Sequence, residues 1–153
     1  MKIIIIEDDH FFQNFYSLKL KELGYQVEVA SNGQEGLDKI KIFLPDLILL
    51  DIIMPVMDGF QVLTALKNDP LLSKYPVVVF STLGQESNIK KAIELGARDY
   101  INKSFFDFDV FLKRVVTYLP QANQTVIPAF TLSSIEGEAG IHAKSTGSPS
   151  SRG

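Results

Sequence analysis

The sequence predicts an α/β fold, in which a doubly wound, five-stranded parallel sheet carries helices on both faces. Three observations point to it. Short apolar runs alternate with segments of helical periodicity about five times, as expected of successive β-α units. The first run, residues 3–6, is four consecutive isoleucines, which is typical of a strand buried on both faces. The composition, with 46% apolar and 22% charged residues among 153, suits one ordinary globular domain.

The first strand, over 3–6, is followed by a helix predicted over 10–23. Its apolar residues recur with amphipathic spacing, and a glycine at position 24 follows as a stop. A second strand is expected over 25–30. After a short Ser-Asn-Gly turn, a second helix is predicted over 34–43, and Pro45 marks its end.

The second half of the pattern repeats the same alternation. Turn chemistry at Pro55 and at the Asp58-Gly59 pair precedes the third helix, and Gly96 ends the fourth. The last helix begins near Asp107 or Asp109, where the helix dipole favours a carboxylate. The remaining expected elements are a strand over 47–50, a helix over 60–67, a strand over 77–80, a helix over 86–95, a short strand over 100–101 and a helix over 107–119.

The pattern divides the chain into a domain over 1–119 and a tail over 120–153. The tail is rich in Gly, Ser and Thr towards its end, which favours a flexible linker or extension. A second interpretation is that its part from Glu136 onward derives from an expression vector. Under either interpretation the tail carries no catalytic group.

Composition excludes several classes of protein. With no Cys, the chain has no disulfide framework, Cys-based zinc site or thiol nucleophile. Its net charge of −3 argues against direct nucleic-acid binding. No apolar run approaches the ~20 residues of a membrane helix, and an acidic cluster interrupts the first one where a signal peptide would continue. We therefore expect a cytoplasmic protein with neither nucleic acid nor membrane as a partner.

Polar residues follow four of the five predicted strands. In parallel α/β sheets the carboxyl ends of the strands share one edge, and ligands bind there. We therefore expect these side chains to converge. They are Glu7, Asp8 and Asp9 after the first strand, Asp51 after the third, Ser81 and Thr82 after the fourth, and Asn102, Lys103 and Ser104 after the fifth.

A cluster of carboxylates repels itself unless it binds a cation, and hard oxygen ligands on short loops suit Mg²⁺. Such a metal would offset the repulsion while Asp51 accepts a phosphoryl group by in-line displacement. Lys103 would supply positive charge to the phosphoryl oxygens, and Ser81 a hydrogen bond. Taken alone, each residue is more often a cap, turn or surface group, and only their conjunction is specific. Asp9 is more readily a helix cap than a metal ligand.

Competing chemistries lack their motifs. No Gly-rich phosphate loop follows the first strand, so neither a dinucleotide fold nor a P-loop NTPase is supported. No Gly-x-Ser-x-Gly elbow is present, so an α/β-hydrolase is not supported. A flavodoxin-type FMN protein shares the topology, but the acidic residues at 7–9 would repel its phosphate.

Four segments together resemble the receiver domain of two-component response regulators, a chemotaxis-regulator-like (βα)₅, flavodoxin-like fold. The resemblance covers roughly residues 1–119. The matching segments are Ile-Ile-Ile-Ile-Glu-Asp-Asp at 3–9, the run from Pro45 to Gly59, Pro-Val-Val-Val-Phe-Ser at 76–81 and Gly-Ala-Arg-Asp-Tyr-Ile-Asn-Lys at 96–103.

The resemblance implies roles for the site residues. Asp51 would be the phosphoacceptor, taking phosphate from a phosphohistidine on a sensor histidine kinase or a histidine phosphotransfer protein. Asp8 would bind Mg²⁺ directly and Glu7 through water, with Asp51 and the backbone carbonyl of Ile53 as further ligands. The phosphoryl-binding and switch residues would be Ser81, Lys103 and Tyr100. Asp9 and Thr82 would at most contact the site residues, without touching the metal or the phosphoryl group themselves.

The chain departs from the family at three places. Ser104 follows Lys103 where the family usually has Pro, often with a cis bond. Ile53 and Leu83 are apolar at two positions that, in the family, tune how water reaches the acyl phosphate; neither side chain can orient a water by hydrogen bonding, so we expect slow spontaneous dephosphorylation. No output domain is expected after residue 119.

These observations predict a phosphorylation-activated signalling switch that acts through protein contacts. It would not be an enzyme beyond its own phosphorylation and dephosphorylation. It would signal to a downstream protein target through the face formed by the fourth helix, fifth strand and fifth helix. Analogy with the family also allows a homodimer through the fourth and fifth helices. Two alternatives stay open: a phosphate shuttle in a multistep relay, and a degenerate receiver that acts as a constitutive interaction or dimerisation module. A small-molecule hydrolase is more remote, because the sequence implies no substrate pocket.

Overall fold

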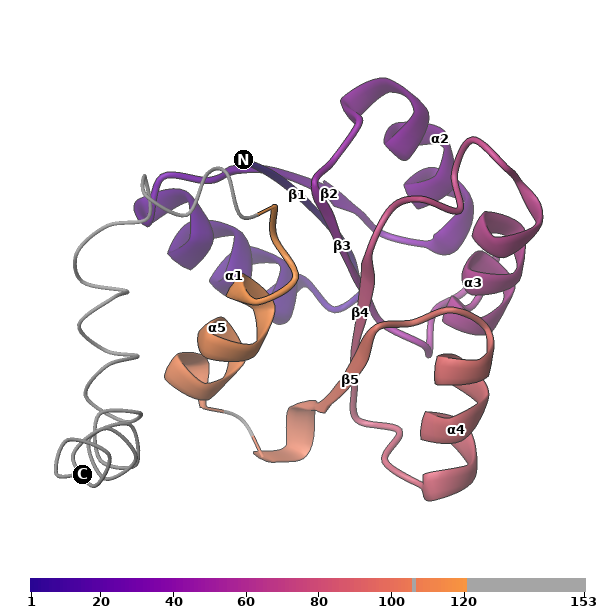
Figure 1. Cartoon of the computed structure of the whole chain (residues 1–153). Coiled ribbons are helices and arrows are strands. Elements are labelled where there is room, and N and C mark those ends of the chain that lie inside the picture. Colours follow the sequence, from indigo (N-terminus) through magenta and orange to yellow (C-terminus); the bar gives the residue numbers. More distant parts are fainter. Residues whose placement is uncertain (106, 121–153) are drawn as a thin grey trace, which may run out of the picture.

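The computed structural model describes residues 1–105 and 107–120 of the chain, without the side chain of Phe105 (Figure 1). Its core is a five-stranded sheet of order β2-β1-β3-β4-β5, in which every neighbouring pair is parallel. The predicted doubly wound α/β fold is therefore confirmed. The strands are β1 (Lys2–Ile6), β2 (Gln26–Ala30), β3 (Leu47–Leu50), β4 (Val77–Ser81) and β5 (Asp99–Asn102).

Helices cover both faces of the sheet. In Figure 1, α1 and α5 lie on one face, and α2, α3 and α4 lie on the other. The split follows from the alternation of side chains along a strand. Ile3 and Ile5 pack with the α1 and α5 side, whereas Ile4 and Ile6 pack with the opposite side. The helices are α1 (His10–Glu22), α2 (Gly33–Phe43), α3 (Gly59–Asn68), α4 (Glu86–Glu94) and α5 (Phe108–Val116), with a short 3₁₀ helix η1 (Lys103–Phe105).

Most element boundaries lie within one or two residues of those predicted, and the exceptions have local causes. The last helix was predicted to Leu119 but α5 ends at Val116, because Tyr118 and Leu119 donate their N–H groups to carbonyls three residues back. The 3₁₀ turn after β5 was not predicted. There, the backbone N–H of Ser104 donates to Oδ1 of Asn102 at 2.8 Å, a local turn that propensity alone does not reveal.

The β3–α3 connection packs tightly against the end of β3. The N–H of Gly59 donates to the carbonyl of Ile52 at 2.8 Å. A Cβ at position 59 would lie 2.4 Å from the carbonyl oxygen of Asp51 and 2.7 Å from the Cα of Ile52. Only glycine allows this approach, so the start of α3 is held directly against the backbone of Asp51. Asp58 caps α3 in a reciprocal capping box with Gln61.

Within the described part of the chain, no helix is long and apolar enough to cross a membrane. The predicted division at residue 119 and the nature of the tail fall almost wholly outside the described residues. They remain predictions.

Candidate functional site

Three carboxylates that are separated in sequence meet at the carboxyl edge of the sheet. Glu7 and Asp8 follow β1 and Asp51 follows β3, and each offers an oxygen within 4.8 Å of the other two. Glu7 and Asp51 are buried, with 3% and 7% of their surfaces exposed, whereas Asp8 faces solvent. The predicted convergence of these three acids is thus present in the structure.

Backbone hydrogen bonds align the two strand ends that carry these acids. The N–H of Asp51 donates to the carbonyl of Ile6 at 2.9 Å, which continues the β1–β3 ladder by one residue. The N–H of Ile52 donates to Oδ1 of Asp51 at 2.8 Å, so one carboxylate oxygen is oriented by its own chain. The second oxygen, Oδ2, faces the ammonium described next.

Lys103 brings a buried positive charge to the carboxylates. Its Nζ contacts Oε1 of Glu7 in a close ion pair and lies 3.4 Å from Oδ2 of Asp51. Its side chain is only 4% exposed. Although Ser104 replaces the family's usual proline, the ammonium still reaches the acids, and all described peptide bonds are trans. The site therefore combines two buried carboxylates with one buried ammonium.

Burial dominates the electrostatics of Glu7. Desolvation, followed by the negative charge of Asp51, raises the pKa of Glu7 to about 7, while the hydrogen bond and charge of Lys103 and the N–H of Asp9 pull it down. The Asp9 N–H donates to Oε2 of Glu7 at 3.0 Å. One ammonium is not enough to neutralise two buried carboxylates, so the site favours an additional positive charge.

Ser81 and Tyr100 both form hydrogen bonds with the backbone of a single residue, Leu83. Ser81 is fully buried, and its Oγ accepts a hydrogen bond from the N–H of Leu83 at 3.1 Å. The Tyr100 hydroxyl donates to the carbonyl of the same Leu83, and its ring is buried at 7% exposure. Burial raises the pKa of Tyr100, a hydrogen bond with Ser81 lowers it, and the charge of Asp51 raises it. Tyr100 thus points inward, towards Ser81 and Asp51.

The other predicted residues lie at the edge of the site: Asp9 caps a helix, and Thr82 and Ile53 are exposed. Oδ1 of Asp9 accepts hydrogen bonds from the N–H groups of Phe11 and Phe12 at 2.8 and 3.3 Å, which is the helix-capping role that the sequence favoured. Thr82 is exposed. Ile53 lies two residues beyond Asp51, with 55% of its surface exposed.

Sequence reasoning missed one buried polar residue that supports the site. Gln13 donates from Nε2 to the carbonyl of Glu7 and, at 3.1 Å, to Oγ of Ser31. It lies on the same helix face as Tyr16 and Leu20, and all three are buried. A polar residue in phase with a buried helix face was the available signal. Gln13 ties α1 to the backbone of the acidic loop.

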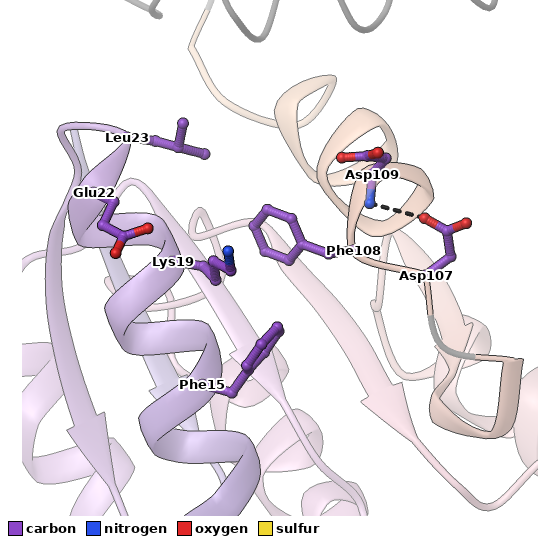
Figure 2. Close-up of a pocket in the computed structure, with 7 residues that line it drawn as sticks. All are labelled: Phe15, Lys19, Glu22, Leu23, Asp107, Phe108 and Asp109. Atoms are coloured by element: carbon purple, nitrogen blue, oxygen red, sulfur yellow. Dashed lines mark hydrogen bonds between the residues drawn. The ribbon is translucent and has the colours of Figure 1, made fainter.

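A groove of about 420 Å³ lies between α1 and α5 (Figure 2). Lys19 Nζ lies 5.9 and 6.0 Å from the ring centres of Phe15 and Phe108 there. At its rim, Oδ1 of Asp107 caps α5 by accepting the N–H of Asp109 at 2.9 Å, the dashed line in Figure 2. None of the residues predicted to carry chemistry lines this groove, so the candidate site lies at the strand ends.

The carboxylate cluster fits a hard divalent cation. Its donors are oxygen atoms from short loops, and Mg²⁺ is usually held in proteins by one or two carboxylates with water and phosphate oxygens completing the shell. Asp8 is open to solvent, Glu7 and Asp51 are partly neutralised by Lys103, and the three acids are close enough to share one ion.

Comparison with known proteins identifies a family to which this chain is similar in sequence and in fold. A family model described as the response regulator receiver domain matches residues 3–116. The BeF₃-activated N-terminal receiver domain of RstA from Klebsiella pneumoniae has a TM-score of 0.72 and 30% identity to this chain, covering 79% of this chain and 100% of that one.

Two curated relatives are longer proteins. The transcriptional regulatory protein CrdR of Helicobacter pylori is 32% identical over 127 residues, which are 83% of this chain and 59% of that protein. The DNA-binding dual master transcriptional regulator RpaA of Synechocystis is 34% identical over 123 residues, which are 80% of this chain and 51% of that protein. The chain therefore spans between half and three fifths of these relatives.

These relatives correct one prediction. The exclusion of nucleic acid as a partner is wrong, because RpaA is named as a DNA-binding regulator and CrdR as a transcriptional one. The inference rested on the net charge of −3 of this chain. That charge is summed over this chain alone, which spans only part of the length of these relatives, so it carries no information about the rest of such regulators.

The raised pKa of Glu7 predicts a pH dependence of stability. Glu7 has an ordinary pKa of 4.5 when unfolded and about 7 when folded, so between these values the folded chain binds more protons. Stability then falls as the pH rises through this window. We expect the free energy of unfolding of wild type to decrease from pH 4.5 to 7 relative to Glu7→Gln, in urea titrations without divalent cations. Equal pH slopes for the two proteins would contradict the assignment.

Proposed function

The chain belongs to the response regulator receiver domain family of two-component systems, and we propose that it is a switch whose Asp51 accepts a phosphoryl group from a phosphohistidine donor in the presence of Mg²⁺. Receiver domains of two-component response regulators signal by phosphorylation. The observation that carries the proposal for this chain is the position of Asp51. One of its carboxylate oxygens is oriented by the Ile52 N–H, and the other lies 3.4 Å from the Lys103 ammonium.

The proposed reaction is an in-line displacement at phosphorus. An Asp51 carboxylate oxygen forms the new P–O bond while the P–N bond to the donor imidazole breaks, and the electron pair leaves with the imidazole nitrogen. Glu7, Asp8, Asp51 and the backbone carbonyl of Ile53 would hold Mg²⁺, which supplies positive charge to the phosphoryl oxygens when bound. The burial of Lys103 beside Asp51 supports its role as a second, fixed positive charge there.

The proposed response uses Ser81 and Tyr100. The Ser81 hydroxyl would donate to a phosphoryl oxygen on Asp51, and this would hold Tyr100 in the inward position that it has in this structure. Both residues form hydrogen bonds with the backbone of Leu83. A movement of Ser81 would therefore displace Leu83, and with it Tyr100 and the loop that leads into α4. We assign the output to the α4-β5-α5 face on this basis.

The first prediction of this proposal concerns the acceptor itself. Incubated with acetyl phosphate and Mg²⁺, the wild type should gain one phosphoryl mass by intact mass spectrometry, and Asp51→Asn should gain none. Asp38→Asn, the same change on an exposed carboxylate of α2, serves as the matched control and should be labelled like wild type. If wild type stays unlabelled with saturating donor, the degenerate interaction module replaces this proposal.

The second prediction concerns the cation. A ligand that binds only the folded state raises stability by RT ln(1 + [L]/Kd), about 2.7 kcal/mol at a hundredfold excess over Kd. We expect MgCl₂ to raise the melting temperature of wild type but not of Asp8→Asn. Asp9→Asn should keep the response, because asparagine also caps a helix and Asp9 is engaged in the cap. A lost response in Asp9→Asn would place that residue among the ligands instead.

The third prediction concerns the lifetime of the phosphorylated state. The exposed Ile53 and the half-buried Leu83 side chains offer no hydrogen bond to an attacking water. One added hydrogen bond is worth about 0.5–1.5 kcal/mol, so Ile53→Asn should shorten the half-life of phosphorylated protein roughly 2- to 10-fold. Ile53→Val is the control with no new hydrogen-bonding group. The decay is followed by intact mass after the donor is removed, and an unchanged half-life in Ile53→Asn would refute the explanation.

A further inference from the structure

We propose that Phe12, supported by Phe80, is the positioning residue that holds the Lys103 ammonium against Asp51. This inference rests on the proposed function, because it assigns a residue to the transfer reaction described above. Phe12 lies in the first turn of α1 and Phe80 in β4, so the two rings reach the lysine from different elements.

Contacts around Lys103 carry the inference. Its Nζ lies 4.4 Å from the centre of the Phe12 ring and 5.5 Å from that of Phe80. The two rings pack edge to face, with centroids 6.1 Å apart and an interplanar angle of 88°. An ammonium within about 6 Å of a ring centre is attracted by the electrons of its face, and most strongly where water is excluded. Water is excluded here, since the Lys103 side chain is 4% exposed.

Little open space adjoins the two rings and the two acids. A void of about 10 Å³, on the order of one water, is lined by Glu7, Asp51, Phe12 and Phe80 among others. The ammonium itself lies near two carboxylate oxygens and two aromatic rings.

The two ion pairs of Lys103 do not by themselves keep its ammonium near Asp51. A lysine side chain has a flexible stem of four carbons, and fixing it in one conformation costs about 2 kcal/mol of rotamer entropy. The residue after it is Ser104, which does not restrict the backbone as a proline would. Glu7 alone would draw the ammonium away from Asp51, since the Glu7 contact is the closer of the two. The Phe12 ring keeps Nζ within reach of both acids.

The test compares rates of phosphorylation by acetyl phosphate with Mg²⁺, followed by intact mass. Phe12→Leu keeps an apolar side chain and removes the ring, and we expect roughly 3- to 10-fold slower transfer. Phe12→Tyr keeps a ring face and should restore the wild-type rate. Phe11→Leu is the matched control, the same change on a neighbouring ring that is 65% exposed, and should not slow the reaction.

A double-mutant cycle separates positioning from general damage to the fold. If Phe12 acts through Lys103, Phe12→Leu should cause no further loss in a Lys103→Ala background. An equal loss in both backgrounds, or a wild-type rate in Phe12→Leu, would overturn the inference. Thermal melts of each variant identify any that do not fold, and Phe12→Met replaces Phe12→Leu in that event.

A second readout requires no phosphoryl transfer. In the unphosphorylated wild type, proton NMR should show cross-peaks between the Lys103 ε-methylene and the Phe12 ring, with the methylene shifted upfield by the ring current. Their absence would overturn the inference, whatever the labelling shows. An unlabelled wild type that still shows these contacts would instead leave the positioning intact and refute the proposed function.

Discussion

The balance of charge among Glu7, Asp51 and Lys103 decides the geometry of the candidate site. Two carboxylates and one ammonium are buried within a few ångströms of one another, and a buried charge is stable only when it is paired. Removing one partner of such a pair typically costs about 3–5 kcal/mol, because the other charge is left uncompensated. Above the raised pKa of Glu7, the arrangement holds one more negative charge than positive charge before Asp8 is counted, and this imbalance makes the edge receptive to a cation.

The parallel sheet is what makes this charged arrangement possible. Its central strands are buried on both faces, and the backbone bonds between Asp51 and Ile6 hold the two acidic strand ends in register. The Gly59 contact presses α3 against the backbone of Asp51, and the Gln13 amide bonds the backbone of Glu7 to α1. The carboxylates are therefore positioned by elements whose own stability comes from apolar packing elsewhere.

The same edge links Asp51, the proposed acceptor, to the loop that leads into α4. Leu83 is bonded through its N–H to Ser81 and through its carbonyl to Tyr100, so one residue connects the hydroxyl beside Asp51 with an aromatic ring of β5. Both groups are buried, and packed interiors tend to occupy discrete arrangements rather than deform continuously. A small displacement of Ser81 can thus be passed to the loop before α4 through a single residue.

The sequence by itself determined the fold class and the strand ends that carry the site. The apolar runs and helix stops are local signals, and the rule that parallel strands share a carboxyl edge converts them into the grouping of Glu7, Asp8, Asp51, Ser81 and Lys103. Only the tertiary structure decided how these groups pair. That Lys103 contacts Glu7 more closely than Asp51, that it lies over the Phe12 ring, and that Gln13 supports the acidic loop all depend on helix phase and side-chain rotamers. Those are set by packing between elements distant in sequence, which local patterns do not encode.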